Sequence, residues 1–271
     1  MAFQFSLAQP PSSGFSLATA IQTLGLTTNL KLLLDAGRAD SYSSGQKWLD
    51  LSGNGYDFFR GTDGTSQSSD PTFNGGIGGQ SAAEYWSGDG GDYFTYDTTN
   101  ETWMQNLHKN NAVFSFAAWV YGPSSGSTID IMGDSGSSLS NIGIHLAIRL
   151  DGTIAPLVQV VNGTGSAAAS MNITYGSSLA SRWNFFAGAI DEAAGTSALR
   201  VNAVTDTPSS TYTSPSASSA TYTMQLMARG NAVATAASGT RMSSFAMWEG
   251  TALTAANLTA IYNETKTKFG L

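Results

Sequence analysis

The sequence predicts an all-β protein folded as an antiparallel β-sandwich. Short apolar runs recur along the chain, turn-forming residues separate them, and no helical pattern lies between one run and the next. The 271 residues include 30 Gly, and only 11% are charged, well below the roughly 25% of an average soluble protein. A surface so poor in charge must consist of Ser, Thr, Asn, Gln and Gly, which is typical of turn-rich secreted or virion proteins.

Residues 1 to 28 are predicted to form an N-terminal arm, which leaves residues 29 to 271 as a single domain. The run Gln9-Pro10-Pro11-Ser12-Ser13-Gly14 interrupts the arm, and only a weak apolar pattern follows it. Two alternatives remain for the arm, an anchor to a larger particle or a disordered tail. The start also lacks the basic and apolar stretches of a signal peptide, so we expect any route out of the cell to be assembly into a virus particle and lysis.

The predicted strands are apolar runs that end at turn formers. The first, Leu30–Leu34, ends at Asp35-Ala36-Gly37. Ile142–Leu150 alternates between apolar and polar residues and meets Asp151-Gly152, a strong hairpin signal. The other predicted strands are Val113–Tyr121, Thr153–Val161, Trp183–Ile190, Leu199–Val204, Tyr222–Ala228 and Met242–Trp248.

One short helix is predicted near the C-terminus. Thr254 is a suitable N-cap, and Leu258, Ile261 and Tyr262 recur at three- and four-residue spacing. This spacing gives the helix one apolar face, which we expect to dock on the sandwich. The Ser-, Thr- and Pro-rich stretch Thr205–Ser219 has no apolar period and is predicted to be an exposed loop.

Charge and composition exclude several partners. The chain has 12 Lys and Arg against 19 Asp and Glu, a net charge of −7, and no clustered excess of positive charge of the kind that nucleic acid requires. No stretch approaches the roughly 18 consecutive apolar residues of a membrane span, so we expect no membrane insertion. The absence of cysteine excludes disulfides and thiolate metal sites.

Five stretches, in order along the chain, resemble one family. Residues 31 to 58 (KLLLDAGRADSYSSGQKWLDLSGNGYDF) look like the first strand and turn of laminin-G-like, concanavalin-A-like jelly rolls, in the subtype common in bacteriophage structural proteins. Two residues depart from the family's pattern: Ala203 stands where the family often has Gly, and Asn257 stands where it often has Glu. The other four stretches are residues 85–94 (YWSGDGGDYF), 114–121 (FSFAAWVY), 182–203 (RWNFFAGAIDEAAGTSALRVNA) and 242–263 (MSSFAMWEGTALTAANLTAIYN).

The resemblance implies a jelly-roll β-sandwich and a role in a phage particle. We expect a non-enzymatic virion protein, either a capsid decoration protein or an adhesion module of a tail or head fibre, whose loops bind host surface glycans. Its expected partners are other virion proteins, bound through the arm, and further copies of itself in a symmetric oligomer such as a trimer. The alternatives are a carbohydrate-active enzyme of the laminarinase-like fold, and a bacterial lectin located at the cell surface rather than on the particle.

Residues 127 to 138 (STIDIMGDSGSS) contain part of a serine protease signature. Gly133-Asp134-Ser135-Gly136 matches the nucleophile loop of chymotrypsin-like proteases, in which the base and its carboxylate precede the serine. Only His108 precedes Ser135 in this chain, and the expected sequence context of the base is absent. We therefore interpret Thr128–Gly133 as a strand and Asp134–Asn141 as the hairpin loop that follows it.

The same stretch contains part of a glycosidase signature. Ile129-Asp130-Ile131 matches the middle of the catalytic strand of laminarinase-like enzymes. Retaining hydrolysis needs two carboxyl groups roughly 5 to 5.5 Å apart, but the nucleophile position is Thr128. Only Asp130 with Asp134 remains as a pair, which does not by itself provide an acid and a nucleophile.

The candidate glycan-binding residues are aromatic. Rings that lie in or beside polar loops can stack on sugar faces while neighbouring polar groups bind the hydroxyls. The alternatives are packing at the sheet edge and contacts between subunits, where aromatic residues are also enriched. The five candidates are Tyr42, Tyr56, Tyr85, Trp86 and Tyr93.

The candidate metal is a structural calcium ion in the turn Asp50-Leu51-Ser52-Gly53-Asn54-Gly55. Calcium takes six to eight oxygen ligands, and Asp50 and Asn54 would contribute side-chain oxygens. In the alternative, both side chains hydrogen-bond the backbone of the turn. The acidic loop Asp89 to Asp92 has the same two interpretations, a calcium site or side chains that hydrogen-bond the backbone of their own turn. His145 is expected in the core or at an edge, and His108 in solvent.

Overall fold

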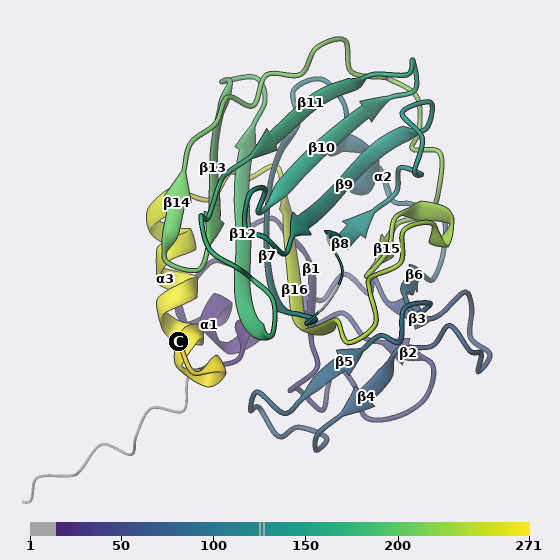
Figure 1. Ribbon diagram of the computed structural model, residues 1–271, viewed down its shortest axis with the longest axis vertical. Coiled ribbons are helices and arrows are strands. Elements are labelled where there is room, and N and C mark those ends of the chain that lie inside the picture. Colours follow the sequence, from purple (N-terminus) through teal and green to yellow (C-terminus); the bar gives the residue numbers. More distant parts are fainter. Residues whose placement is uncertain (1–14, 125, 127) are drawn as a thin grey trace, which may run out of the picture.

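Two antiparallel sheets face each other across an apolar interior in the computed structural model, which describes residues 15–124, 126 and 128–271 (Figure 1). The first sheet runs in the order β14 (Val204–Asp206), β13 (Thr196–Val201), β12 (Arg182–Asp191), β7 (Val113–Gly122), β16 (Arg241–Glu249), β5 (Tyr85–Ser87) and β4 (Thr72–Asn74), and β1 (Leu30–Asp35) also pairs with β16. The second runs β11 (Ala167–Asn172), β10 (Leu157–Asn162), β9 (Ile142–Arg149), β8 (Thr128–Gly133), β15 (Gln225–Leu226), β6 (Phe94–Tyr96), β3 (Phe58–Arg60) and β2 (Lys47–Trp48). The predicted antiparallel β-sandwich is therefore confirmed.

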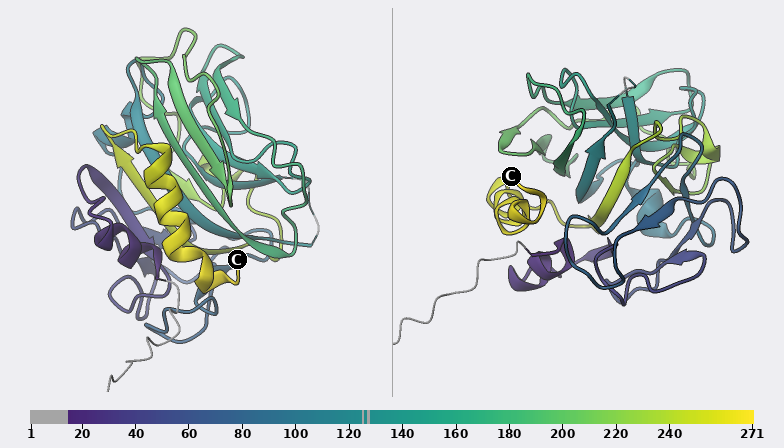
Figure 2. Two further views of the ribbon diagram at one scale, coloured as in Figure 1. Left: turned by 90° about the vertical axis from the view of Figure 1, so that its left-hand side faces the viewer. Right: turned by 60° about the horizontal axis from the view of Figure 1, so that its bottom comes forward.

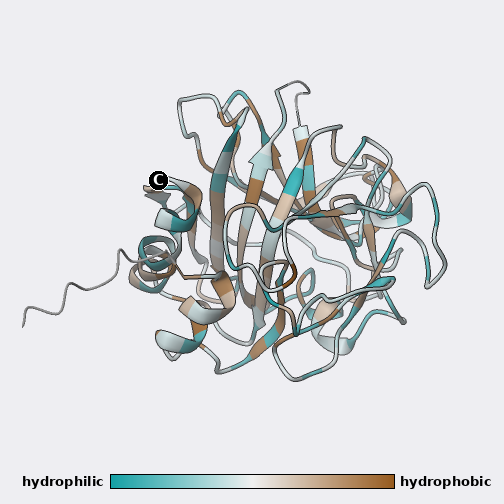
Figure 3. Ribbon diagram, turned by 90° about the horizontal axis from the view of Figure 1, so that it is seen from below, coloured by the Kyte–Doolittle hydropathy of each residue, from teal (hydrophilic) through white to brown (hydrophobic). Residues whose placement is uncertain are grey.

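The interior is built by strands whose successive side chains point to opposite faces. On β9, Ile144, Leu146 and Ile148 lie between the sheets and are buried. Strand β16 contributes to two apolar clusters. Met247 packs between the sheets, and Trp248 packs on the outer face of the first sheet, in what is here called the outer cluster. Figure 3 shows brown, hydrophobic segments along the central strands.

The outer cluster is covered by the C-terminal helix α3 (Ala255–Thr265), which lies along β12 and β13 (Figure 2). Thr254 caps it as predicted, since its side chain accepts a hydrogen bond from the backbone N of Asn257, and the Asn257 side-chain oxygen accepts one from the backbone N of Thr254. Leu258 and Ile261 are fully buried on the face toward the sheet. A 3₁₀ turn, η2 (Lys266–Phe269), follows the helix.

Helix α1 (Leu17–Thr23) packs on the domain, within the stretch that the sequence assigns to an arm. Leu17 and Ile21 are buried in the outer cluster, and the backbone N of Ala18 donates to the Asp35 carboxylate at 3.1 Å. Residues 15 to 28 therefore lie against the domain, because an amphipathic turn meets an apolar sheet face and a buried acceptor. Residues 1 to 14 of the predicted arm lie outside the described residues.

Other differences are local. The predicted strand Leu199–Val204 is divided at Asn202, whose φ of 50° places it in a turn between β13 and β14. The predicted Thr153–Val161 starts only at Leu157, because Asp151 binds the backbone and hydroxyl of Thr153 and prolongs the turn. Two short helical segments, α2 (Thr102–Asn106) and η1 (Gly230–Ala232), lack an apolar period long enough to read in the sequence. Within the described residues, every helix is too short or too polar to cross a bilayer.

Candidate functional site

A polar pocket of about 440 Å³, here called the edge pocket, opens where β4, β5 and β16 meet the loop that follows β5. Its size falls within the roughly 300 to 1,000 Å³ of small-molecule sites. It combines hydroxyls, carboxylates, one aromatic ring and one guanidinium. The residues that line it are Ser68, Asp70, Thr72, Tyr85, Ser87, Gly88, Asp89, Asp92, Ser238, Gly239 and Arg241.

Strand register places Arg241 between two tyrosines. Arg241 pairs with Ser87 of β5 and with Tyr121 of β7, and Tyr85 lies two residues from Ser87 on the same face. The guanidinium carbon lies 4.8 Å from the ring centre of Tyr85 and 4.3 Å from that of Tyr121. Both distances are within the range of a cation–π contact, so the two rings hold the charge in a fixed position.

The other side of the edge pocket is acidic. Asp92 is 3% exposed, its Oδ2 accepts from the backbone N of Asp89 at 3.0 Å, and its Oδ1 is buried without a hydrogen-bond partner. Burial raises the pKa of Asp92 to about 6, and the neighbouring carboxylates of Asp89 and Asp70 add to the rise. Asp92 therefore lines the edge pocket with one oxygen, Oδ1, that is buried and receives no hydrogen bond from the described residues.

The loops around the edge pocket hold each other in place. The backbone of Gly88 donates to Thr240 at 2.9 Å and accepts from Gly239 at 2.9 Å, and the Thr235 hydroxyl donates to the carbonyl of Gly90 at 2.7 Å. Gly90 has a φ of 110°, which a residue with a side chain rarely adopts. The pocket is therefore preformed by backbone contacts between two loops.

The five aromatic candidates do not form one surface, and only Tyr85 lines the edge pocket. Trp86 has no exposed area and packs between the sheets, with its ring centre 4.5 Å from that of Tyr42. Tyr42 and Tyr93 are each 8% exposed, and half-buried Tyr56 packs on Trp103. The prediction for Trp86 is corrected, because a ring without exposed area cannot stack on a sugar.

Asp50 and Asn54 organise their turn by hydrogen bonds. The Asp50 carboxylate accepts from the backbone N of Leu33 and Ser52, each at 2.9 Å, and from the Ser52 hydroxyl at 2.6 Å. Asn54 directs its amide NH₂ at the carbonyls of Leu30 and Lys31, each at 3.0 Å. These side chains do not fit a calcium site, because donors occupy the carboxylate and the amide presents nitrogen. Across the described residues, no three His, Cys, Asp or Glu side chains group to hold a metal.

The residues of the two enzyme signatures are buried. Ser135 lies in the interior with its Oγ 3.2 Å from Nδ1 of His145, and neither residue is more than 1% exposed. Burial lowers the pKa of His145 to about 3 and raises that of Asp134 to about 7. Asp130 is 4% exposed and binds Arg229 at 2.8 Å. The strand predicted over Thr128–Gly133 is confirmed as β8.

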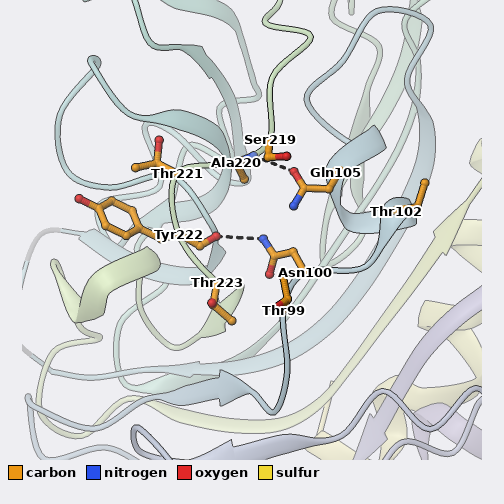
Figure 4. Close-up of a pocket in the computed structure, with 9 residues that line it drawn as sticks. All are labelled: Thr99, Asn100, Thr102, Gln105, Ser219, Ala220, Thr221, Tyr222 and Thr223. Carbon is orange, nitrogen blue, oxygen red and sulfur yellow. Dashed lines mark hydrogen bonds between the residues drawn. The ribbon is translucent and has the colours of Figure 1, made fainter.

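A second pocket, of about 300 Å³, lies between α2 and the loop of residues 219–223 (Figure 4). Its amide side chains hold that loop: Asn100 donates to the carbonyl of Tyr222 at 2.9 Å, and Gln105 accepts from the backbone N of Ala220 at 2.7 Å (Figure 4). Nearby His108 is buried and its Nε2 lies 3.0 Å from the carbonyl of Ser218, so the expectation of a solvated histidine is wrong. The hydrogen bonds of Asn100 and Gln105 hold residues 219–223 in place beside α2.

Comparison with known proteins finds a shared fold and no family. No protein-family model and no curated protein matches the sequence. Among solved structures, the binding domain of botulinum neurotoxin DC in complex with rat synaptotagmin II aligns with a TM-score of 0.58 and 14% identity, over 88% of this chain and 52% of that chain. A second structure concerns the cell entry of botulinum neurotoxin type C, which is described as dependent upon interaction with two ganglioside molecules. It aligns with a TM-score of 0.59 and 15% identity, over 88% of this chain and 52% of that chain.

A third structure is more distant. Trypanosoma rangeli sialidase in complex with the inhibitor DANA aligns with a TM-score of 0.53 and 11% identity, over 86% of this chain and 32% of that chain. This chain thus spans about half the length of the toxin domains and about a third of the sialidase. At these identities the likeness establishes the β-sandwich fold alone.

Proposed function

We propose that this protein is a non-enzymatic carbohydrate-binding β-sandwich module that holds its glycan in the edge pocket. One observation carries the proposal: Tyr85, the Arg241 guanidinium stacked on its ring, and the acidic residues Asp89 and Asp92 line the same hollow. Sugars present apolar ring faces for aromatic contact, and hydroxyls that both donate and accept hydrogen bonds. The edge pocket supplies a partner for each of these features.

Two further observations support a binding role. The solved structures of similar fold include a toxin whose cell entry is described as dependent upon two ganglioside molecules. The carboxylate at the centre of the glycosidase-like stretch, Asp130, is held by Arg229 and is 4% exposed, which leaves it poorly placed to act on a substrate. Ser135, in the protease-like stretch, has no exposed area.

The test is glycan binding by the purified protein, first on an array that includes bacterial surface polysaccharides and then by calorimetry with each sugar that binds. Tyr85→Ala and Asp92→Asn are expected to weaken binding at least tenfold. Tyr222→Ala is the matched control, since it removes a half-buried tyrosine from the second pocket. Equal losses for Tyr85→Ala and Tyr222→Ala, or no binding to any sugar, would contradict the proposal.

The finer proposal is that the module belongs to a bacteriophage particle, as a capsid decoration or fibre adhesion protein in a symmetric oligomer. It is supported by the five stretches that resemble phage laminin-G-like domains and by a surface of low charge. We expect the full chain to be found in purified particles by mass spectrometry, and a chain that starts at residue 15 to be lost from them. Recovery from the bacterial cell surface alone would favour the lectin alternative.

A further inference from the structure

We propose that the saccharide held in the edge pocket is acidic, with its carboxylate paired to the Arg241 guanidinium and its hydroxyls directed at Asp89 and Asp92. This inference rests on the proposed function and names the class of ligand.

Arg241 is oriented but not neutralised. Its guanidinium stacks on Tyr85 and Tyr121, and it makes no hydrogen bond or ion pair to any residue within 15–124, 126 and 128–271. The residue is half-buried at the wall of the edge pocket. A stacked guanidinium keeps the N–H groups along its edge available, in the fork geometry that binds a carboxylate through two hydrogen bonds.

Five other arginines of the chain are used within the protein, in contrast to Arg241. Arg38, Arg149 and Arg229 pair with Asp40, Asp151 and Asp130. Arg60 donates to two backbone carbonyls, and Arg200 donates to the hydroxyls of Thr205 and Thr259. The sixth, Arg182, has a buried Nε without a partner among the described residues, but its guanidinium stacks on no ring there. A stacked arginine without an acceptor is therefore a feature of the edge pocket and not of the arginines in general.

The acidic side of the pocket narrows the class of anion. Asp89 and Asp92, on the loop after β5, present carboxylates that accept from hydroxyls and repel negative charge, and the whole chain carries a net charge of −7. A compact polyanion such as phosphate would meet both Arg241 and these carboxylates. A sugar acid separates its carboxylate from its hydroxyls, so each part meets a complementary side of the pocket.

The test compares acidic sugars with their neutral counterparts by calorimetry. The probes are the methyl glycosides of glucuronic, galacturonic and N-acetylneuraminic acids, each beside the same glycoside with the carboxyl group reduced to an alcohol. We expect at least one acid to bind tenfold or more tightly than its partner in the native protein, and Arg241→Gln to bring that ratio close to one. Arg149→Gln, which removes an exposed arginine from β9, is the matched control and should retain the ratio.

A salt titration of the native protein provides a second measurement that does not depend on a variant. Affinity for the acid should fall between 50 and 500 mM NaCl, while affinity for the neutral partner stays constant, because salt screens the attraction between charges. Equal affinity for acid and neutral partner, or a ratio that survives Arg241→Gln, overturns the inference and leaves the proposed function standing. Failure of every sugar to bind overturns both.

Discussion

The Oγ atom of Ser135 lies 3.2 Å from Nδ1 of His145 in the interior of the protein, on either side of the hairpin between β8 and β9. The two residues have the chemistry of a nucleophile and a base, but neither is more than 1% exposed. Burial lowers the pKa of His145 to about 3, so its imidazole is neutral near pH 7. The contact is a buried hydrogen bond that stabilises the hairpin.

Ser135→Ala is predicted to destabilise the fold without changing glycan binding. The substitution leaves a buried imidazole nitrogen without its partner, which costs about 1 to 3 kcal/mol in the free energy of unfolding. Urea denaturation measures the loss, with Ser137→Ala, an exposed serine of the same loop, as the control. A loss of glycan affinity at unchanged stability would place Ser135 in a functional site instead.

Asp134 is predicted to make stability depend on pH. Full burial raises its pKa from 3.8 to about 7, so between about pH 4 and 7 the folded protein retains a proton that the unfolded chain releases. The contribution of Asp134 to the free energy of unfolding therefore falls as the pH rises through this window. His145 acts in the opposite direction, because its lowered pKa makes the unfolded chain bind the extra proton below about pH 6.5.

A comparison with Asp134→Asn isolates the carboxyl from the histidine. The free energy of unfolding of the variant minus that of the native protein should increase from pH 4.5 to pH 7.5, as measured by urea denaturation at each pH. Asp151→Asn is the control, since Asp151 is exposed and its pKa is lowered by its bonds to Thr153. A difference for Asp134→Asn that stays constant over this range would show that its carboxyl does not titrate there.

Asp92 is predicted to make glycan binding depend on pH. Its pKa is raised to about 6, chiefly by burial, so its carboxylate gains a proton as the pH falls through 6 and ceases to be a charged acceptor. Affinity for the bound sugar should drop several-fold between pH 7.5 and pH 5, and Asp92→Asn should bind weakly with much less change. Calorimetry at both pH values decides this, and a pH profile unaltered by Asp92→Asn would assign the titration to another group.

Ile21 is predicted to contribute strongly to stability, although it lies in the stretch that the sequence assigns to an arm. Its side chain is fully buried in the outer cluster, so Ile21→Ala should cost about 2 to 5 kcal/mol in the free energy of unfolding. Gln22→Ala, at the neighbouring exposed position of α1, should cost little. Urea denaturation curves that coincide for Ile21→Ala and the native protein would show that α1 is not docked in solution.

The parts of the fold that the sequence predicts are those with local signals. Strand β8 has the predicted bounds, and Thr254 caps α3 as predicted. Both signals are local, because apolar runs, turn formers and cap residues act within a few positions. The sequence assigns helix α1 to an arm, because its seven residues are stabilised by distant partners such as Asp35 and not by a local pattern. Short helices without tertiary contacts are marginal in water, so their sequences carry a weak pattern.

The sequence predicts only part of the candidate site, because the rest depends on contacts between distant strands. Tyr85 was predicted from its polar neighbours, and the two-residue period of a strand would have placed Trp86 on the opposite face, inside the sandwich. The sequence gives no signal for Arg241, because its place in the pocket depends on the register of β16 against both β5 and β7. No local pattern in a single sequence reports which strands become neighbours.

The position of β16 has a consequence for the order of folding. This strand lies between β7 and β5 and also pairs with β1, so that Phe245 meets Leu34 from the opposite end of the chain. During synthesis, β1, β5 and β7 emerge first and keep unpaired edges until residues 241–249 leave the ribosome. Pairings so distant in sequence form slowly, and a nascent chain that stalls before β16 would expose these edges to aggregation.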